Sequence, residues 1–170
     1  MPVGFEATVN FKPPDVTYCN ASHVVEVEVD PETGGVEIVR YVVVNDSGVL
    51  INPTLVEGQL QGGIAHGIGN ALYEWMGYDE NSQPVITNFA EYLLPTSTAV
   101  PNIEIIHVET PSTLNPLGVK GAGEAGVIPV AGVVISAVEN ALEPFGVWIG
   151  EAPITPVRII ELIEASQAAR

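Results

Sequence analysis

The 170-residue sequence is poor in cysteine, in basic residues and in charged residues as a whole. Its single cysteine, Cys19, cannot form an internal disulfide or a cysteine-rich metal site, which fits a reducing, cytoplasmic setting. Five Lys and Arg residues stand against twenty-one Asp and Glu residues, so the formal net charge is −16. A chain of this charge repels phosphate backbones and anionic lipid surfaces, which excludes nucleic acid as an expected partner.

Long apolar runs are also missing from the sequence. The N-terminus has no basic segment followed by an apolar core, and no run of about 18 apolar residues occurs, so we predict neither an export signal nor a membrane span. Charged residues make up only 15% of the chain and hydrophobic residues 46%. A sequence of this kind can hide apolar and glycine-rich faces against another polypeptide.

The pattern of apolar residues predicts an α+β fold in one domain. Alternating apolar residues on both sides of Asp30–Gly35 indicate a β-hairpin within residues 21–48, with its second strand deep at residues 42–44. An extended segment at 85–94 and a strand at 103–109 should complete a mixed sheet. About three helices should cover it, one over residues 52–76, one after Gly126, and one that starts at Pro156 and frays from Ala165.

The first predicted helix carries two different faces. One is an apolar stripe, and the opposite one combines glycine with polar residues: Gln59, Gly62, Gly63, His66, Gly67 and Asn70. Glycine inside a helix costs about 1 kcal/mol relative to alanine, so something should pack very close to this face. We expect a cofactor or a partner there. If so, Gly63→Ala and Gly67→Ala should stabilise the isolated chain but block its assembly with the upstream portion of the subunit.

A glycine-rich loop from Gly118 to Gly126 is the strongest local candidate for a binding site. Its glycines allow close approach of the backbone to a ligand, and a helix beginning just after the loop would direct free amides towards it. It is not a P-loop, because no Gly-Lys-Ser/Thr sequence is present at the required spacing. Composition alone leaves open a plain turn between strand and helix, with Glu124 as an ordinary acid of a first helical turn.

Two motifs together resemble a known family. Residues 58–69 (GQLQGGIAHGIG) and 115–126 (NPLGVKGAGEAG) are similar to sequences near the end of the large subunits of molybdenum hydroxylases, the family of xanthine dehydrogenase and aerobic carbon monoxide dehydrogenase. Residues 2–7 (PVGFEA), 27–34 (VEVDPETG) and 51–53 (INP) also resemble this family, in the same order. The resemblance covers nearly the whole chain and is closest to the carbon monoxide dehydrogenase-like branch.

The resemblance implies specific roles for residues of these motifs. Glu124 would stand beside molybdenum as the general base, and Gln59 would contact the molybdopterin cofactor. We predict Lys120, Gly121 and Gly123 as further cofactor-binding residues, since they form the loop around Glu124. No metal ligand is expected from this chain.

The resemblance also implies the surroundings of the chain. We expect residues 1–170 to form a C-terminal molybdopterin-binding domain whose partners are the remainder of the large subunit and the FAD and iron-sulfur subunits or domains of the parent enzyme. The cofactor should be molybdopterin, as its cytosine dinucleotide, with molybdenum. Neither cofactor nor activity is expected of the isolated chain. The parent's substrate would be a small molecule such as CO, an aldehyde, a purine or another N-heterocycle.

Two alternatives stay open at this point. The chain could be a non-catalytic assembly module that binds a partner subunit through the glycine-bearing helix face. It could also be an independent anion-binding protein that uses the loop from Gly118 to Gly126.

Overall fold

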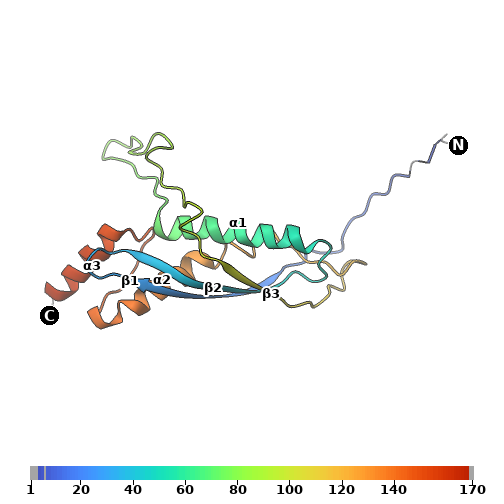
Figure 1. The fold of residues 1–170 in the computed structure, drawn as a ribbon. Helices are drawn as coiled ribbons and strands as arrows, with labels where there is room; N and C mark the ends of the chain where they lie inside the picture. Colours follow the sequence, from blue (N-terminus) through green and yellow to red (C-terminus); the bar gives the residue numbers. More distant parts are fainter. Residues whose placement is uncertain (1–3, 6, 169–170) are drawn as a thin grey trace.

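The computed structural model describes residues 4–5 and 7–168 and contains a three-stranded sheet and three α-helices (Figure 1). In chain order the elements are β1 (Asn20–Val29), β2 (Val36–Asp46), α1 (Pro53–Leu72), β3 (Ile103–His107), α2 (Val130–Ala141), the 3-10 turn η1 (Glu143–Phe145) and α3 (Pro156–Ala168). The predicted α+β class, with a hairpin extended into a sheet and packed by three helices, is confirmed.

The sheet has the order β1-β2-β3 and is mixed, as predicted. Strands β1 and β2 pair antiparallel, with an irregularity of register between Glu26 and Val27, whereas β3 runs parallel to β2. The connecting turn is held by Asp30, whose carboxylate accepts the N–H of Glu32 at 2.8 Å. This is the local hydrogen bond for which Asp is favoured in turns.

The hydrophobic core lies between one face of this sheet and the helices. Helix α2 contacts both β1 and α1, and Figure 1 shows α1 lying along the length of the sheet. Alternate residues of β1 and β2 point into the core, and they meet the apolar stripe of α1 and one face of α2. Fully buried members are Tyr41, Val43, Ile64, Ile68, Val130, Val134, Val138 and Ile159.

Both predicted proline helix starts are present. Asn52 caps α1, because its side chain accepts the N–H of Leu55, and Thr155 does the same for the N–H of Arg158 at the start of α3. Helix α3 continues to Ala168, so the prediction that the tail frays from Ala165 was wrong for residues 165–168; Arg170 lies outside the described residues.

The predicted strand 103–109 ends at His107, and two further predictions of local structure were wrong. Helix α1 ends at Leu72 and not near residue 76, because the N–H groups of both Tyr73 and Glu74 turn back to the carbonyl of Gly69. Trp75 therefore leaves the apolar stripe and is 49% exposed. The segment 85–94 forms turns and bends instead of an extended strand, since Asn88 accepts backbone bonds that curl the chain at residues 90–92.

Residues 76–100 project away from the body beyond the end of α1 (Figure 1). Their apolar side chains have little to pack against, and Phe89 is 86% exposed. Among the helices that the structure describes, none is long and apolar enough to cross a bilayer.

Candidate functional site

The glycine-rich loop is anchored at its first residues to the turn that follows β2. The carbonyl of Gly118 accepts the N–H groups of Val49 and Ser112, and Gly48 pairs with Val119 in an isolated antiparallel bridge. Gly48 and Gly118 both have positive φ, 65° and 68°, and a Cβ on Gly48 would lie 2.2 Å from the carbonyl oxygen of Gly118. Only glycine fits this close crossing of two backbones.

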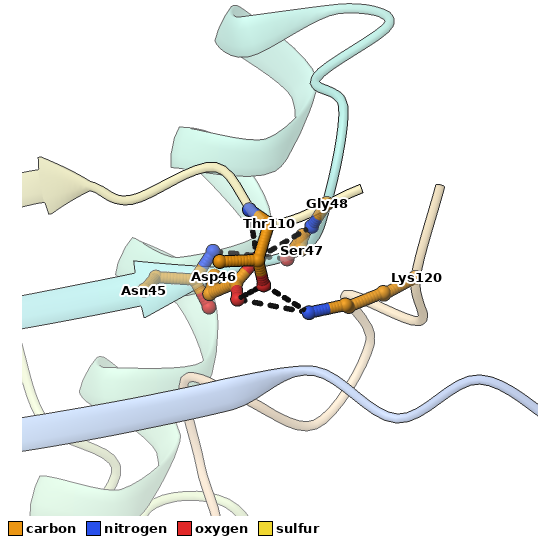
Figure 2. A network of polar contacts seen from close by, with 6 residues as sticks. All are labelled: Asn45, Asp46, Ser47, Gly48, Thr110 and Lys120. Atoms are coloured by element: carbon orange, nitrogen blue, oxygen red, sulfur yellow. Dashed lines mark hydrogen bonds and ion pairs between the residues drawn. The ribbon is translucent and has the colours of Figure 1, made fainter. Parts of the chain in front are cut away.

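Lys120 extends this anchor through a network of polar side chains at the end of β2 (Figure 2). Its Nζ lies 2.8 Å from Asp46 Oδ2 and 2.6 Å from Thr110 Oγ1, and its backbone N–H donates to the carbonyl of Ser47. The Thr110 hydroxyl also donates to the Asp46 carboxylate, which accepts the N–H groups of Gly48 and Thr110 as well.

This network neutralises the charge of Lys120 within the chain. The Lys120 ammonium, and after it the Thr110 hydroxyl, holds the pKa of Asp46 well below its usual value. The side chains of Lys120 and Asp46 are only 14% and 12% exposed. Lys120 therefore forms a structural ion pair with Asp46. Its predicted contact with a cofactor stays a prediction.

Glu124, at the other end of the loop, is fixed by its backbone and not by its side chain. Gln59 Nε2 on α1 donates to the carbonyl of Gly123 at 2.8 Å. The N–H groups of Val127 and Ile128 donate to the carbonyl of Glu124 itself, at 3.0 and 3.2 Å. The Glu124 side chain is exposed, and no ion pair to it is found among residues 4–5 and 7–168.

The carbonyl of the next residue, Ala125, is bound from the sheet. His23 Nε2 on β1 lies 3.0 Å from this oxygen, and His23 Nδ1 lies 2.7 Å from the hydroxyl of Tyr41 on β2. Three successive carbonyls, from residues 123 to 125, thus receive donors from α1, from the following turn and from β1.

The loop also packs directly on α1. A Cβ on Gly63 would lie 2.8 Å from the carbonyl carbon of Gly126, and a Cβ on Gly126 would lie 2.6 Å from the carbonyl oxygen of Leu60. A Cβ on Gly67 would lie 2.3 Å from the Cβ of Val130 at the start of α2. Something does pack very close to this helix face, as predicted, but at Gly63 and Gly67 it is the chain's own loop and helix.

This packing corrects two predictions. Alanine at Gly63 or Gly67 should not stabilise the chain, because its Cβ would meet backbone or a buried side chain. The face that a partner could contact is also smaller than predicted, since only Gln59, Gly62, His66 and Asn70 of that set remain exposed. The alternative of an assembly module that uses the whole face loses its support.

The helix predicted after Gly126 is present as α2, but it does not begin directly at Glu124. It starts at Val130, six positions after Glu124, and its first turn contains no acidic residue. The intervening N–H groups of Val127, Ile128 and Val130 bond to carbonyls of the same turn. Glu124 therefore does not lie in the first turn of α2, and the amides of Val127, Ile128 and Val130 are not free to bind an anion.

A surface open to a ligand lies beside Glu124. A Cβ on Gly58 or Gly62 of α1, or on Gly123 of the loop, would find nothing within 4 Å. Gln59 stands between these glycines and is exposed, and Gly121 is exposed as well. The backbone of α1 is thus uncovered at Gly58 and Gly62, on either side of Gln59 in the sequence. No group of three or more potential metal-binding side chains occurs in the described part of the chain.

Sequence reasoning missed Asp46, Thr110, His23 and Tyr41. Asp46 belonged to a predicted turn, and nothing local connects it with Thr110 or Lys120, which follow 64 and 74 residues later. His23 carried a usable signal, because it continues the inward row of Val25, Val27 and Val29 although it is polar. A polar residue on a core-facing row needs a partner.

The chain is similar to known proteins in both sequence and fold. The family described as "Molybdopterin cofactor-binding domain" matches residues 2–101. The chain is 43% identical over 163 residues to the nicotine 6-hydroxylase large subunit of Paenarthrobacter nicotinovorans, covering 94% of this chain and 20% of that protein. It is 31% identical to the carbon monoxide dehydrogenase large chain of Hydrogenophaga pseudoflava, covering 92% and 19%.

Solved structures agree with these relatives. Quinoline 2-oxidoreductase from Pseudomonas putida 86 superposes with a TM-score of 0.89 and 42% identity, over 96% of this chain and 21% of that one. The Cu,Mo-CO dehydrogenase gives a TM-score of 0.88 at 27% identity, over 92% and 20%. The chain spans about a fifth of the length of these relatives. The predicted resemblance is confirmed, and the chain belongs to the molybdopterin cofactor-binding domain family of molybdenum-dependent dehydrogenases and hydroxylases.

Proposed function

We propose that this chain supplies one wall of the cofactor site and the general base, Glu124, of a molybdenum hydroxylase. The observation that carries the proposal is the contrast between the backbone and the side chain of this residue. Its carbonyl and both neighbouring carbonyls are hydrogen-bonded, while its carboxylate is exposed and unpaired among the described residues. A base needs such a combination, because it must be held in place and still be free to accept a proton.

The residues around Glu124 fit the cofactor of this family. Because the space beside Gly58, Gly62 and Gly123 is unfilled, the ring system of a pterin can come close to their backbone. The amide of Gln59 can form hydrogen bonds with the polar edge of that ring system. Gly121, which is also exposed, adds to the same surface. Lys120 is paired with Asp46, so this face suits the ring and metal end of the cofactor better than its phosphates. When bound, the molybdenum cofactor supplies two-electron redox chemistry at the metal.

The chain's own contribution to turnover is proton transfer and orientation. The Glu124 carboxylate would accept, at one of its oxygens, the proton that the oxygen nucleophile loses as it bonds to an electron-poor carbon of the substrate, and the bound cofactor would supply the acceptor for the two electrons of the C–H bond that breaks. Gln59 contributes twice, because it faces the glycine-lined surface and also holds the carbonyl of Gly123. The ion pair of Lys120 fixes the beginning of the loop, so Lys120 acts on Glu124 only through the backbone.

The parent enzyme would take a small molecule of the kind that its relatives oxidise. The nicotine 6-hydroxylase and quinoline 2-oxidoreductase relatives favour an N-heterocycle over CO, because they share 43% and 42% of aligned residues with this chain against 31% for the carbon monoxide dehydrogenase large chain. We further propose molybdopterin cytosine dinucleotide as the cofactor, and FAD and iron-sulfur subunits together with the rest of the large subunit as partners.

A Glu124→Gln variant of the assembled holoenzyme tests the proposed base. Glutamine keeps the size and the hydrogen bonding of the side chain but cannot accept the proton, so kcat should fall by a factor on the order of 10² to 10⁴. Molybdenum content, measured by elemental analysis, should stay at the wild-type level. Wild-type turnover in a molybdenum-replete variant would refute the role of Glu124 as base, and loss of molybdenum would make it a cofactor-holding residue instead.

A further inference from the structure

We infer that His23 and Tyr41 are positioning residues for Glu124. Together they form a hydrogen-bonded pair, the His23–Tyr41 pair, that holds the carbonyl of Ala125 in place. This inference rests on the proposed role of Glu124 as base. It adds a connection from the sheet to the active loop that neither residue's place in the sequence suggests, since Ala125 follows His23 by 102 positions.

The geometry determines which atoms donate. The carbonyl of Ala125 carries no hydrogen, so His23 Nε2, 3.0 Å away, must donate to it. In a neutral imidazole the other nitrogen is then an acceptor, and the Tyr41 hydroxyl, 2.7 Å from Nδ1, donates to it. The carbonyl of Ala125 therefore fixes the tautomer of His23, and the Tyr41 hydroxyl donates to the ring nitrogen that is left as acceptor.

The surroundings favour the uncharged form of both groups. Burial lowers the pKa of His23 below its ordinary value, an effect that the bond to Ala125 partly opposes, and burial also raises the pKa of Tyr41. The two rings meet edge to face, with centroids 5.7 Å apart and an interplanar angle of 84°. Tyr41 is fully buried, so its ring is locked by the core and cannot follow His23 if the loop moves.

The His23–Tyr41 pair and Gln59 hold the loop from opposite sides of Glu124. Gln59 binds the carbonyl before it, from α1, and His23 binds the carbonyl after it, from β1. Gly126 then lies against the backbone of Leu60, so the peptide after Ala125 cannot retreat towards α1. Misplacement of a reacting group by about 1 Å can cost on the order of 10²-fold in rate, so a double hold of this kind matters for a base.

The test compares His23→Phe, which keeps a ring but has no donor, with His23→Gln, whose amide can still donate to Ala125. Hydrogen exchange of residues 124–130 should become roughly 3- to 10-fold faster in His23→Phe, the factor expected for the loss of one net hydrogen bond. In the holoenzyme, kcat should fall on the order of 10- to 10²-fold with little change in KM and in molybdenum content. His23→Gln should restore both quantities to within about threefold of wild type.

Tyr41→Phe gives a second variant in case His23→Phe does not fold, because it removes only the hydroxyl. It should accelerate exchange in the same loop and lower kcat by a smaller factor. Ser22→Ala, at an exposed position on the same strand, is the matched control and should change neither quantity.

Three results would overturn the inference. Unchanged hydrogen exchange of residues 124–130 in both His23→Phe and Tyr41→Phe would show that the His23–Tyr41 pair does not hold the loop, whether or not Glu124 is the base. Faster exchange with unchanged kcat, in an enzyme that Glu124→Gln inactivates, would show a structural bond without influence on the base. Full activity of Glu124→Gln would show that Glu124 is not the base. This outcome can be told apart from the other two, because it does not depend on the hydrogen exchange of the His23 variants.

Discussion

The two ends of the glycine-rich loop are both held by backbone hydrogen bonds, but they differ in what their charged side chains do. At Lys120 the side chain is bound, since its ammonium pairs with Asp46 and Thr110 beneath the turn that follows β2. At Glu124 the backbone is bound, through the carbonyls of residues 123 to 125, and the carboxylate is left exposed. A charged side chain that is fully paired stabilises the fold, whereas one that is held but unpaired is available for chemistry.

This difference separates two loop residues that sequence reasoning placed in one group. Lys120 and Glu124 are four positions apart and both lie among glycines, so the sequence favoured functional roles for both. Substitution at the Lys120 end should mainly change stability, and substitution of the Glu124 side chain should mainly change turnover.

The largest effect on stability is expected from Gly126→Ala, at the Glu124 end. Gly126 is buried, and a Cβ there would lie 2.6 Å from the carbonyl oxygen of Leu60 and 2.9 Å from its Cα, both backbone atoms that cannot move aside. Overpacking of this kind costs about 1 to 3 kcal/mol, which urea denaturation of the chain should detect.

Gly123→Ala is the matched control for Gly126→Ala, because the same atom at position 123 would find nothing within 4 Å. The free energy of unfolding should stay within about 0.5 kcal/mol of wild type. Equal destabilisation by both substitutions would contradict the packing of the loop on α1.

A smaller loss of stability is expected from Lys120→Met. The substitution leaves the Asp46 carboxylate, only 12% exposed, without its main partner, so the free energy of unfolding should fall by about 1 to 2 kcal/mol at pH 7. Arg40→Met is the control, because the Arg40–Glu104 pair is 62% and 51% exposed, so its loss should change the free energy of unfolding much less than Lys120→Met does.

The pH dependence of the same measurement sharpens the Lys120 prediction. The pKa of Asp46 is depressed in the folded chain, so its stabilisation is present above the unfolded value of about 3.9 and is lost as the pH falls towards the folded pKa. Wild type and Lys120→Met should therefore differ at neutral pH and converge in acid. A difference that stays constant while the pH is lowered from 7 to well below 3.9, towards the folded pKa of Asp46, would show that the ion pair is not its source.

Most of the fold could be predicted from local patterns. The hairpin, the capped start of α1 and the start of α3 follow from alternation, from Asn52-Pro53 and from Thr155-Pro156, all of which act over a few residues. The end of α1 could not be predicted, because it depends on two N–H groups that return to the carbonyl of Gly69. The segment 85–94 failed for a similar reason, since turns at Asn88 outweigh its apolar composition.

The candidate site could be predicted only in part, for a physical reason. Glu124 and Gln59 lie in motifs that can be recognised in the sequence. The hydrogen bond that connects the two motifs, from Gln59 to the carbonyl of Gly123, joins residues that are 64 positions apart. The partners of Lys120 and of the Ala125 carbonyl come from strands whose register is set by the whole sheet. Glycine content predicted close packing correctly, yet it could not indicate that the loop itself, and not a partner, packs on Gly63.

The pH dependence of the molybdenum-replete Glu124→Gln holoenzyme tests the central claim most directly. A general base must be ionised, so kcat/KM of the wild-type enzyme should fall on the acid side of its optimum. The residual activity of Glu124→Gln should lose this acidic limb, while Lys120→Met, which leaves the carboxylate in place, should keep it. An acidic limb that persists unchanged in Glu124→Gln would mean that another group accepts the proton and would contradict the account.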